Sequence, residues 1–490
     1  MDESGHDAPE ERSTQPRCGL FTIECNWFAE VGYGDSTTGG SLREKMTRRK
    51  AALLDALGAH LEVVDPGFVG STADVRHALL RFSRQEVDFV LVAFATWAED
   101  FTLVRFLRDA DARLPIVFYC FQSRDLPFRE NVGAQAEVDY LNNTSLVGSL
   151  QGSGSFARIR GDRTNWITLC GPQDEALPRI LTFARAAAAR SRLRRARIAA
   201  LRSMNDQMWS TYVDLYRFFA EVGPSVTFLP FTALADADRA VSPQRVAAER
   251  QRLLELMDVD AGADDERLDA SVRASLAVED LAREQDFDAV ALNDVDENLH
   301  RALGLRPGFY PRGFFQDRRV AVPEADIAMA ALALALTTST GSRFMYTEPF
   351  FTDIESNTFL GGHAGPNDPS IPGVAWARIS EDLEYRDSGH RYAGAPFAWF
   401  EFPHGPATIC HMSEKPAGYA VVSAFVECVP TAFTLHGYPF GAFRPQLPVS
   451  EFFERVMQVG TTQHFLAFPG DVTPAIEALA RVNEWEYVPL

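Results

Sequence analysis

The stretch VDFVLVAFAT, residues 87–96, decides the fold of the N-terminal part of the chain. It is almost continuously apolar, which is typical of a strand that is buried on both faces in a parallel sheet. An amphipathic helical pattern precedes it at residues 72–85, and another follows at residues 101–111. A buried strand between two helices predicts βαβ units and therefore an α/β fold.

The same alternation continues on both sides of this stretch. Further strands are predicted at 18–25, 61–67 and 115–120, with a further helix at 41–60. We therefore predict one doubly wound parallel-sheet (Rossmann-like) domain over residues 17–170, with ligands at the carboxyl ends of its strands. Residues 1–16 are polar and charged, and we expect a disordered tail.

Two side chains of this domain are candidate substrate contacts. Trp97 follows the strand at 87–96, where its ring could stack on a sugar; packing in the core is the alternative. Gln151 lies in the glycine-rich segment GSLQGSGSF, residues 148–156. This segment does not open an obvious helix after a strand, so we interpret it as a flexible connection in which Gln151 could contact a sugar hydroxyl.

Two further domains are predicted after residue 170. Residues 171–325 read as a central, second doubly wound α/β domain. It has a helical linker at 175–196, strands at 197–203, 225–231 and 287–294, and an acidic, solvated helical stretch at 242–284. From residue 326 to 490, short aromatic and β-branched runs broken by Gly and Pro predict an antiparallel, β-rich C-terminal domain.

Composition restricts the classes of partner. The net charge of −20 argues against nucleic acid, because binding to phosphates needs a positive field. The six cysteines are scattered without a CxxC pair, which favours reduced thiols in a cytoplasmic protein. The longest apolar run, IAMAALALALTT at 327–338, is too short to span a membrane, so we expect no membrane association.

Carboxylates and histidines recur around the start of the C-terminal domain. Pro323 suits the first turn of a helix and places Glu324 and Asp326 near its N-terminus, where both read as ordinary first-turn acids. Glu348 follows 24 residues after Glu324, behind an apolar run, so the two glutamates could converge on one end of a sheet.

Two converging carboxylates repel each other unless a cation or a proton lies between them. His363 and His464 could complete a mixed oxygen and nitrogen ligand set. Such a set suits Mn²⁺ or Mg²⁺ better than structural zinc, which prefers thiolates.

Four segments together resemble the L-fucose isomerase and L-arabinose isomerase superfamily. They are PEADIAMAAL (323–332), LGGHAG (360–365), GPATICHMS (405–413) and QHFLAFPGDV (463–472). The first is similar to the family's helix start, the second to its glycine-flanked histidine, and the last to its late histidine. Residues 271–294 also resemble the family's middle domain in texture.

The resemblance implies a metal-dependent aldose–ketose isomerase acting on a pentose or a 6-deoxyhexose. It implies metal ligation by Glu324, Glu348, His464 and His363, with the two glutamates also acting as acid and base. The implied cofactor is Mn²⁺, with Mg²⁺ or Co²⁺ as alternatives. The implied assembly is a homo-oligomer, a trimer or hexamer, with sites near subunit interfaces.

The sequence departs from the family pattern at three places. Pro349, ahead of Phe350 and Phe351, directly follows Glu348 where the family has acidic or aromatic residues, and Gln463 stands where the family often has a second histidine. Residues 363–368 (HAGPND) lack the cysteine of the fucose type. An alternative alignment makes Asp353 the second ligand acid, and Asp353 is also a candidate substrate contact. The alternative functions are a sugar-binding or regulatory protein without catalysis and a sugar epimerase.

Overall fold

The computed structural model describes most of the chain as two compact units. The described residues are 15–31, 41–122, 124, 136, 140–141, 144–201, 208–260, 264–383, 392 and 394–490. Unit 1 comprises Met1–Ala188 and unit 2 comprises Ala189–Leu490, so the division falls within one long helix, α8. The predicted disordered tail lies outside the described residues, apart from its last two. The predicted domain boundaries at 170 and 325 stay predictions.

Unit 1 is built on a parallel sheet with the strand order β2-β1-β4-β5-β6, in which β3 also pairs with β1. Its strands are β1 (Arg17–Ile23), β2 (Glu62–Val64), β3 (Phe68–Val69), β4 (Phe89–Phe94), β5 (Ile116–Phe121) and β6 (Trp166–Gly171). All six residues of β4 are buried, as the apolar run at 87–96 predicted. The predicted parallel strands of this region are confirmed.

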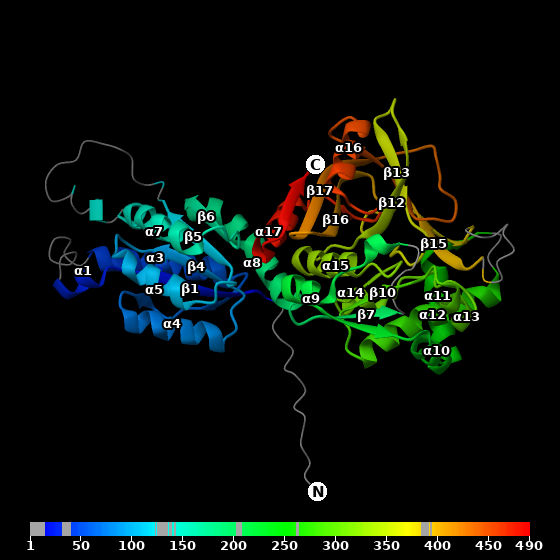
Figure 1. The fold of residues 1–490 in the computed structure, drawn as a ribbon, viewed down its shortest axis with the longest axis horizontal. Helices are drawn as coiled ribbons and strands as arrows, with labels where there is room; N and C mark the ends of the chain where they lie inside the picture. The colour runs from blue at the N-terminus through cyan, green and yellow to red at the C-terminus, as the bar shows by residue number, and fades with distance from the viewer. Residues whose placement is uncertain are drawn as a thin grey trace, which may run out of the picture. The chain divides into compact units, whose positions relative to one another are not determined.

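Helices connect these strands (Figure 1). They are α1 (Asn26–Val31), α3 (Ser41–Gly58), α4 (Thr72–Arg84), α5 (Asp100–Asp109), α7 (Ser145–Arg160) and α8 (Gln173–Leu193). Helix α4 begins with a capping box between Ser71 and Asp74, which satisfies backbone N–H groups of its first turn.

The interpretation of residues 148–156 as a flexible connection was wrong, because they lie within α7. A Cβ atom on Gly148 or Gly152 would come within 2.8 Å or 2.7 Å of the Phe94 ring. These glycines therefore allow α7 to lie directly on β4. Close packing of the helix on the sheet thus outweighs the poor helix propensity of glycine.

Unit 2 contains a second parallel sheet, ordered β11-β10-β7-β8. Its strands are β7 (Arg197–Leu201), β8 (Ser225–Leu229), β10 (Ala289–Leu292) and β11 (Val320–Val322). Helical segments between residues 209 and 316 accompany it: η1 (Trp209–Thr211), α9 (Leu215–Arg217), η2 (Phe218–Val222), α10 (Phe231–Ala240), α11 (Pro243–Leu256), α12 (Asp265–Glu284), α13 (Glu297–Leu303) and α14 (Gly313–Gln316). The acidic stretch at 242–284 forms α11 and α12, as predicted.

The C-terminal part of unit 2 is a seven-stranded, mainly antiparallel sheet, which confirms the predicted β-rich region. Its strands are β12 (Met345–Asp353), β13 (Thr358–Gly362), β16 (Gly405–Lys415), β17 (Gly418–Val429), β18 (Phe440–Pro445), β19 (Phe465–Pro469) and β20 (Glu486–Pro489). The sheet closes on itself because β16 pairs with both β19 and β17. Closure leaves few unpaired backbone groups at its edges.

Three further strands and two helices complete this part. The strands β9 (Asp258–Val259), β14 (Ala377–Glu381) and β15 (Pro396–Phe400) form a small sheet, and α16 (Val449–Val459) and α17 (Thr473–Asn483) lie near the C-terminus of the chain. Within the described part of the chain, no helix combines the length and the apolar character needed to cross a bilayer.

Helix α15 (Ile327–Thr340) joins the two sheets of unit 2. It is buried on nearly all sides and contacts β7, β10 and β11 of the parallel sheet as well as β16 and β19 of the closed sheet (Figure 1). A helix that is apolar all round is expected in such a position, between two layers. Its N-terminus therefore meets strand ends from both sheets.

Candidate metal centre

Glu324 lies in the turn between β11 and α15. The prediction that it belongs to the first helical turn was wrong, because α15 begins at Ile327 with Asp326 as its N-cap. Glu324 and Ala325 have φ angles of 59° and 58°, in the left-handed backbone region that residues other than glycine rarely adopt. Each such residue costs on the order of 1–3 kcal/mol and persists only where surrounding contacts impose it.

Two hydrogen bonds impose this turn. The Glu324 amide donates to Asp294 Oδ1 at 2.8 Å, and the Ala325 amide donates to the carbonyl of Leu292, the last residue of β10, at 3.1 Å. Asp294 is itself fully buried and paired with Arg306. The turn therefore holds the Glu324 backbone against the end of the parallel sheet.

His363 and His464 approach from the closed sheet. His363 follows β13 and His464 precedes β19, and both strands pair with β12. On β12, Glu348 is opposite Gly362 of β13 and Thr347 is opposite Phe465 of β19. The two histidines therefore flank the same point of β12 from opposite sides.

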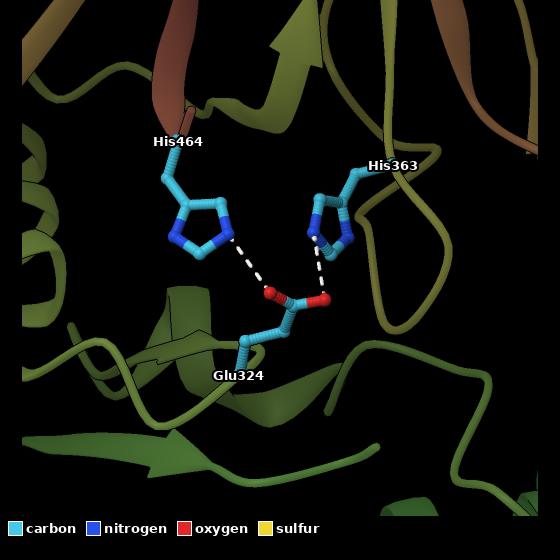
Figure 2. A group of neighbouring side chains, drawn as sticks. All are labelled: Glu324, His363 and His464. Atoms are coloured by element: carbon cyan, nitrogen blue, oxygen red, sulfur yellow. Dashed lines mark hydrogen bonds and ion pairs between the residues drawn. The ribbon is translucent and has the colours of Figure 1, made fainter. Parts of the chain in front are cut away.

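The three side chains converge in the interior, as Figure 2 shows. The Nε2 atom of His464 lies 2.8 Å from Glu324 Oε2, and the Nε2 atom of His363 lies 3.5 Å from Glu324 Oε1. Their potential ligand atoms all lie within 4.8 Å of one another. Glu324, His363 and His464 are 6%, 1% and 0% exposed. This group of one carboxylate and two imidazoles could hold a metal ion.

The outer nitrogen of each imidazole has its own acceptor. His464 Nδ1 donates to Asp326 Oδ2 at 2.9 Å, and His363 Nδ1 donates to the carbonyl oxygen of Ala364. A protonated Nδ1 leaves the lone pair of the neutral ring on Nε2, which in both residues faces Glu324. Carboxylate and carbonyl partners of this kind fix the ring orientation of metal-binding histidines.

His363 Nε2 also meets the requirement for a ligand atom. At 3.5 Å it is too far from Glu324 for a good hydrogen bond, and it has no hydrogen-bond partner among the described residues. A buried polar nitrogen without a partner is costly. A cation held between it, His464 and Glu324 would satisfy this nitrogen, so the donor set fits a metal.

Several buried side chains support the group. Asp326 accepts the Met329 amide at 3.0 Å through its other oxygen, and the Tyr346 hydroxyl donates to Asp326 Oδ2 at 3.3 Å. His411, in the middle of β16, donates from Nδ1 to the carbonyl of His464 at 2.6 Å. Burial lowers the pKa of His411 to about 4, so it is a neutral positioning residue.

Charge couples the three central residues. Burial acts to raise the pKa of Glu324, but His363 and His464 outweigh burial and hold the pKa of this carboxyl well below its usual range. Burial acts to lower the pKa of His464, but Asp326 and Glu324 outweigh it and raise this pKa to about 10. The pKa of His363 is also raised, because Glu324 outweighs burial. Without a metal, a proton therefore occupies the place of the cation.

The other predicted site residues are not members of this group of three. Glu348 is half-buried on β12 and its charge acts on His363, although it is outside the central group of three. Asp353 is the exposed last residue of β12, where it accepts the Ser356 hydroxyl at 2.7 Å. Trp97 and Gln151 belong to unit 1, where Trp97 Nε1 donates to Gln151 Oε1 at 2.8 Å. The structure does not bring Asp353 to the group.

Comparison of the sequence with protein-family models and with curated proteins found no match. The class of site therefore rests on geometry: a buried, preorganised group of one glutamate and two histidines that could hold a metal ion. Asp326 and Asp294 were not predicted as parts of it. The sequence did contain a hint of the role of Asp326, since this acid lies two residues after Glu324, at the start of the predicted helix that becomes α15.

Metal binding is expected to release protons and to strengthen as pH rises. In the metal-free protein His464 stays protonated up to a pKa of about 10. The protonated imidazole stabilises the folded state fully at pH values below its pKa in the unfolded chain, about 6.5. This stabilisation is lost as the pH rises toward the pKa in the folded state. Because a ligating imidazole must be neutral, the metal competes with this proton.

Calorimetric titration of Mn²⁺ in buffers of different ionisation enthalpy measures the proton count. We expect release of about one proton or more per metal and an affinity that rises about tenfold per pH unit between about pH 7 and 9. Binding without proton release would show that His464 is not a ligand.

Asp326→Asn is expected to reduce metal affinity by about 10-fold to 100-fold, because it removes the negative charge behind His464. Asparagine caps helices as well as aspartate, so the unfolding midpoint should change little. The control is Asp264→Asn, which alters the N-cap of α12. If both variants bind Mn²⁺ like the unmodified protein, Asp326 does not tune His464.

Proposed function

We propose that the protein is a metal-dependent isomerase that interconverts an aldose, a pentose or a 6-deoxyhexose, and its ketose. The observation that carries this proposal is the buried Glu324 carboxylate between two imidazoles whose outer nitrogens are anchored. A mixed oxygen and nitrogen set favours Mn²⁺, with Mg²⁺ or Co²⁺ as alternatives. The segments at 323–332, 360–365, 405–413 and 463–472 resemble the L-fucose and L-arabinose isomerases, and this resemblance supports the same function.

The structural setting is compatible with this class. We interpret the two parallel sheets as two doubly wound, Rossmann-like domains that precede the β-rich region. We also propose that the protein acts as a homo-oligomer, a trimer or hexamer, in the cytoplasm. The strained turn at Glu324 supports a functional role, because strain of this kind clusters at functional sites.

The residues divide the chemistry between them. A divalent metal, when bound, polarises the sugar carbonyl as a Lewis acid. Glu324, His363 and His464 would hold it. Glu348 would take the proton of the C2 hydroxyl and return it to the C1 oxygen, while the hydrogen on C2 moves to C1. Its half-buried carboxylate suits this role because it is near enough to His363 for its charge to act on that imidazole.

Glu324 has less freedom to move a proton. Its two oxygens face the two imidazoles, and they keep its pKa low. We therefore propose Glu348 as the principal acid–base group and Glu324 as a ligand that assists it. Burial and the charge of Asp326 raise the pKa of Tyr346, so its hydroxyl stays protonated and keeps Asp326 oriented.

Turnover of a sugar panel tests this proposal. The purified chain with Mn²⁺ is expected to convert at least one pentose or 6-deoxyhexose to its ketose, measured as ketose formed. Glu348→Gln is expected to lower kcat about a thousandfold, within the usual range for general acid–base catalysis, without loss of metal. Asp353→Asn is the matched control on the same hairpin and should retain full turnover.

Three outcomes contradict the proposal in different ways. A chain that binds Mn²⁺ and sugars but turns over none of the panel would instead be a sugar-binding protein. If Asp353→Asn loses activity while Glu348→Gln retains it, the acid–base residue is Asp353. A product that differs from the substrate only at one stereocentre would indicate an epimerase.

A further inference from the structure

Unit 1 contains a recess at the carboxyl edge of its parallel sheet. The chain passes from β1 to β2 on one side and then to β4 on the other, so the topological switch point lies between β1 and β4 (Figure 1). Ligands of open α/β sheets bind at such points. A small recess lies here and is lined by Thr22, Ala95 and Tyr119 at the ends of β1, β4 and β5.

The described lining of this recess carries positive charge and no acid. Arg49 and Lys50, neighbours on α3, both line it, whereas no aspartate or glutamate does so among the described residues. The Lys50 ammonium is 2.8 Å from Asp65 and lies over the Phe68 ring. Arg49 lies over the Phe121 ring, with 5.2 Å between its guanidinium carbon and the ring centroid. In a chain with a net charge of −20, a local excess of cations favours an anionic ligand.

Polar groups of the recess have the chemistry of oxyanion donors. The Thr22 side chain is 6% exposed, and its hydroxyl has no hydrogen-bond partner among the described residues. Ser145, which also lines the recess, is the first residue of the 16-residue helix α7. The side chain of its N-cap, Thr144, makes no hydrogen bond to the first turn of the helix, because it accepts the Trp97 amide and donates to the Leu141 carbonyl. The N-terminal end of a helix favours anions through the direction of its backbone N–H groups and its dipole. A buried hydroxyl without a partner is costly, so a ligand oxygen here would be stabilised.

We propose that this recess binds the oxyanion group, phosphate or carboxylate, of a small metabolite. Arg49 would contribute the charge, and Thr22 and the start of α7 would donate hydrogen bonds. The site lies wholly in unit 1, whereas the candidate metal centre lies in unit 2. The proposal therefore does not depend on the isomerase assignment.

Calorimetric titrations of the full chain test the site, with inorganic phosphate, glycerol 1-phosphate and succinate as separate probes. We expect at least one probe to bind saturably. Arg49→Gln should weaken that probe about tenfold, the value of one charge-assisted hydrogen bond. The matched control is Arg48→Gln on the same helix, whose side chain is 65% exposed and pairs with Glu44; it should leave the affinity unchanged.

Thr22→Val gives a second variant of nearly the same shape and tests the hydroxyl in case Arg49→Gln does not fold. It should also weaken the probe, with an unchanged thermal midpoint. Preference for the phosphates or for succinate identifies the oxyanion. If none of the three probes binds, the proposal is wrong. It is also wrong if every variant that folds, Arg49→Gln or Thr22→Val, binds the probe with the same affinity as the unmodified chain.

Discussion

Glu324→Gln is expected to lower the affinity for Mn²⁺ about a thousandfold and to lower the turnover of the proposed isomerase in proportion. Glu324 is the one anion among the three converging side chains, and its two oxygens face His363 and His464. Removing one partner of a buried charge pair costs about 3–5 kcal/mol, and each 1.4 kcal/mol is about tenfold in affinity. Glutamine preserves the shape, so the loss reports the charge.

The free Mn²⁺ that remains in solution, measured by its electron paramagnetic resonance signal, gives the affinity of each variant. Glu355→Gln is the control, because Glu355 is an exposed acid in the β12–β13 turn. An unchanged affinity in Glu324→Gln would show that a metal binds elsewhere or that the carboxylate is no ligand.

Arg306→Met is expected to destabilise the fold by about 3–5 kcal/mol, because it leaves buried carboxylates without their cation. Arg306 is 2% exposed and lies 3.0 Å from Asp294 and 3.7 Å from Asp382, both buried. Asp294 also accepts the Glu324 amide. The substitution should therefore weaken metal binding as well, through the backbone turn.

Denaturant unfolding of the metal-free chain measures this effect as a shift of the midpoint. The control is Arg301→Met, which removes a cation from the exposed i,i+4 pair with Glu297 on α13. Such a pair contributes about 0.3–0.5 kcal/mol. Equal shifts in the two variants would show that the Arg306 pair does not support the turn.

The alternation of apolar strands and amphipathic helices predicted both parallel sheets. Short aromatic and β-branched runs broken by Gly and Pro predicted the β-rich region after residue 325. Local periodicity carries this information, because a strand buried on two faces and a helix with one apolar face leave different patterns. Helix α7 was missed because its glycines lower helix propensity. Its formation depends on close packing against Phe94, which no local pattern reports.

The candidate site was predictable in part. Glu324, His363 and His464 were nominated, and the structure brings them together. The left-handed turn at Glu324 could not be predicted, because hydrogen bonds that its amides donate to residues 30 or more positions earlier, Asp294 and Leu292, impose it. The same turn separates the roles of two acids that are two positions apart in the sequence: Glu324 faces both imidazoles, whereas Asp326 orients one of them from behind.

The central claim is that Glu324, His363 and His464 hold one divalent metal ion. Pulsed electron paramagnetic resonance of Mn²⁺ bound to the full chain tests it directly, because directly ligated ¹⁴N nuclei modulate the Mn²⁺ signal. The account predicts coupling to two imidazole nitrogens, reduced to one in His363→Ala and in His464→Ala. Bound Mn²⁺ without nitrogen coupling, or a chain that binds no Mn²⁺, would contradict it.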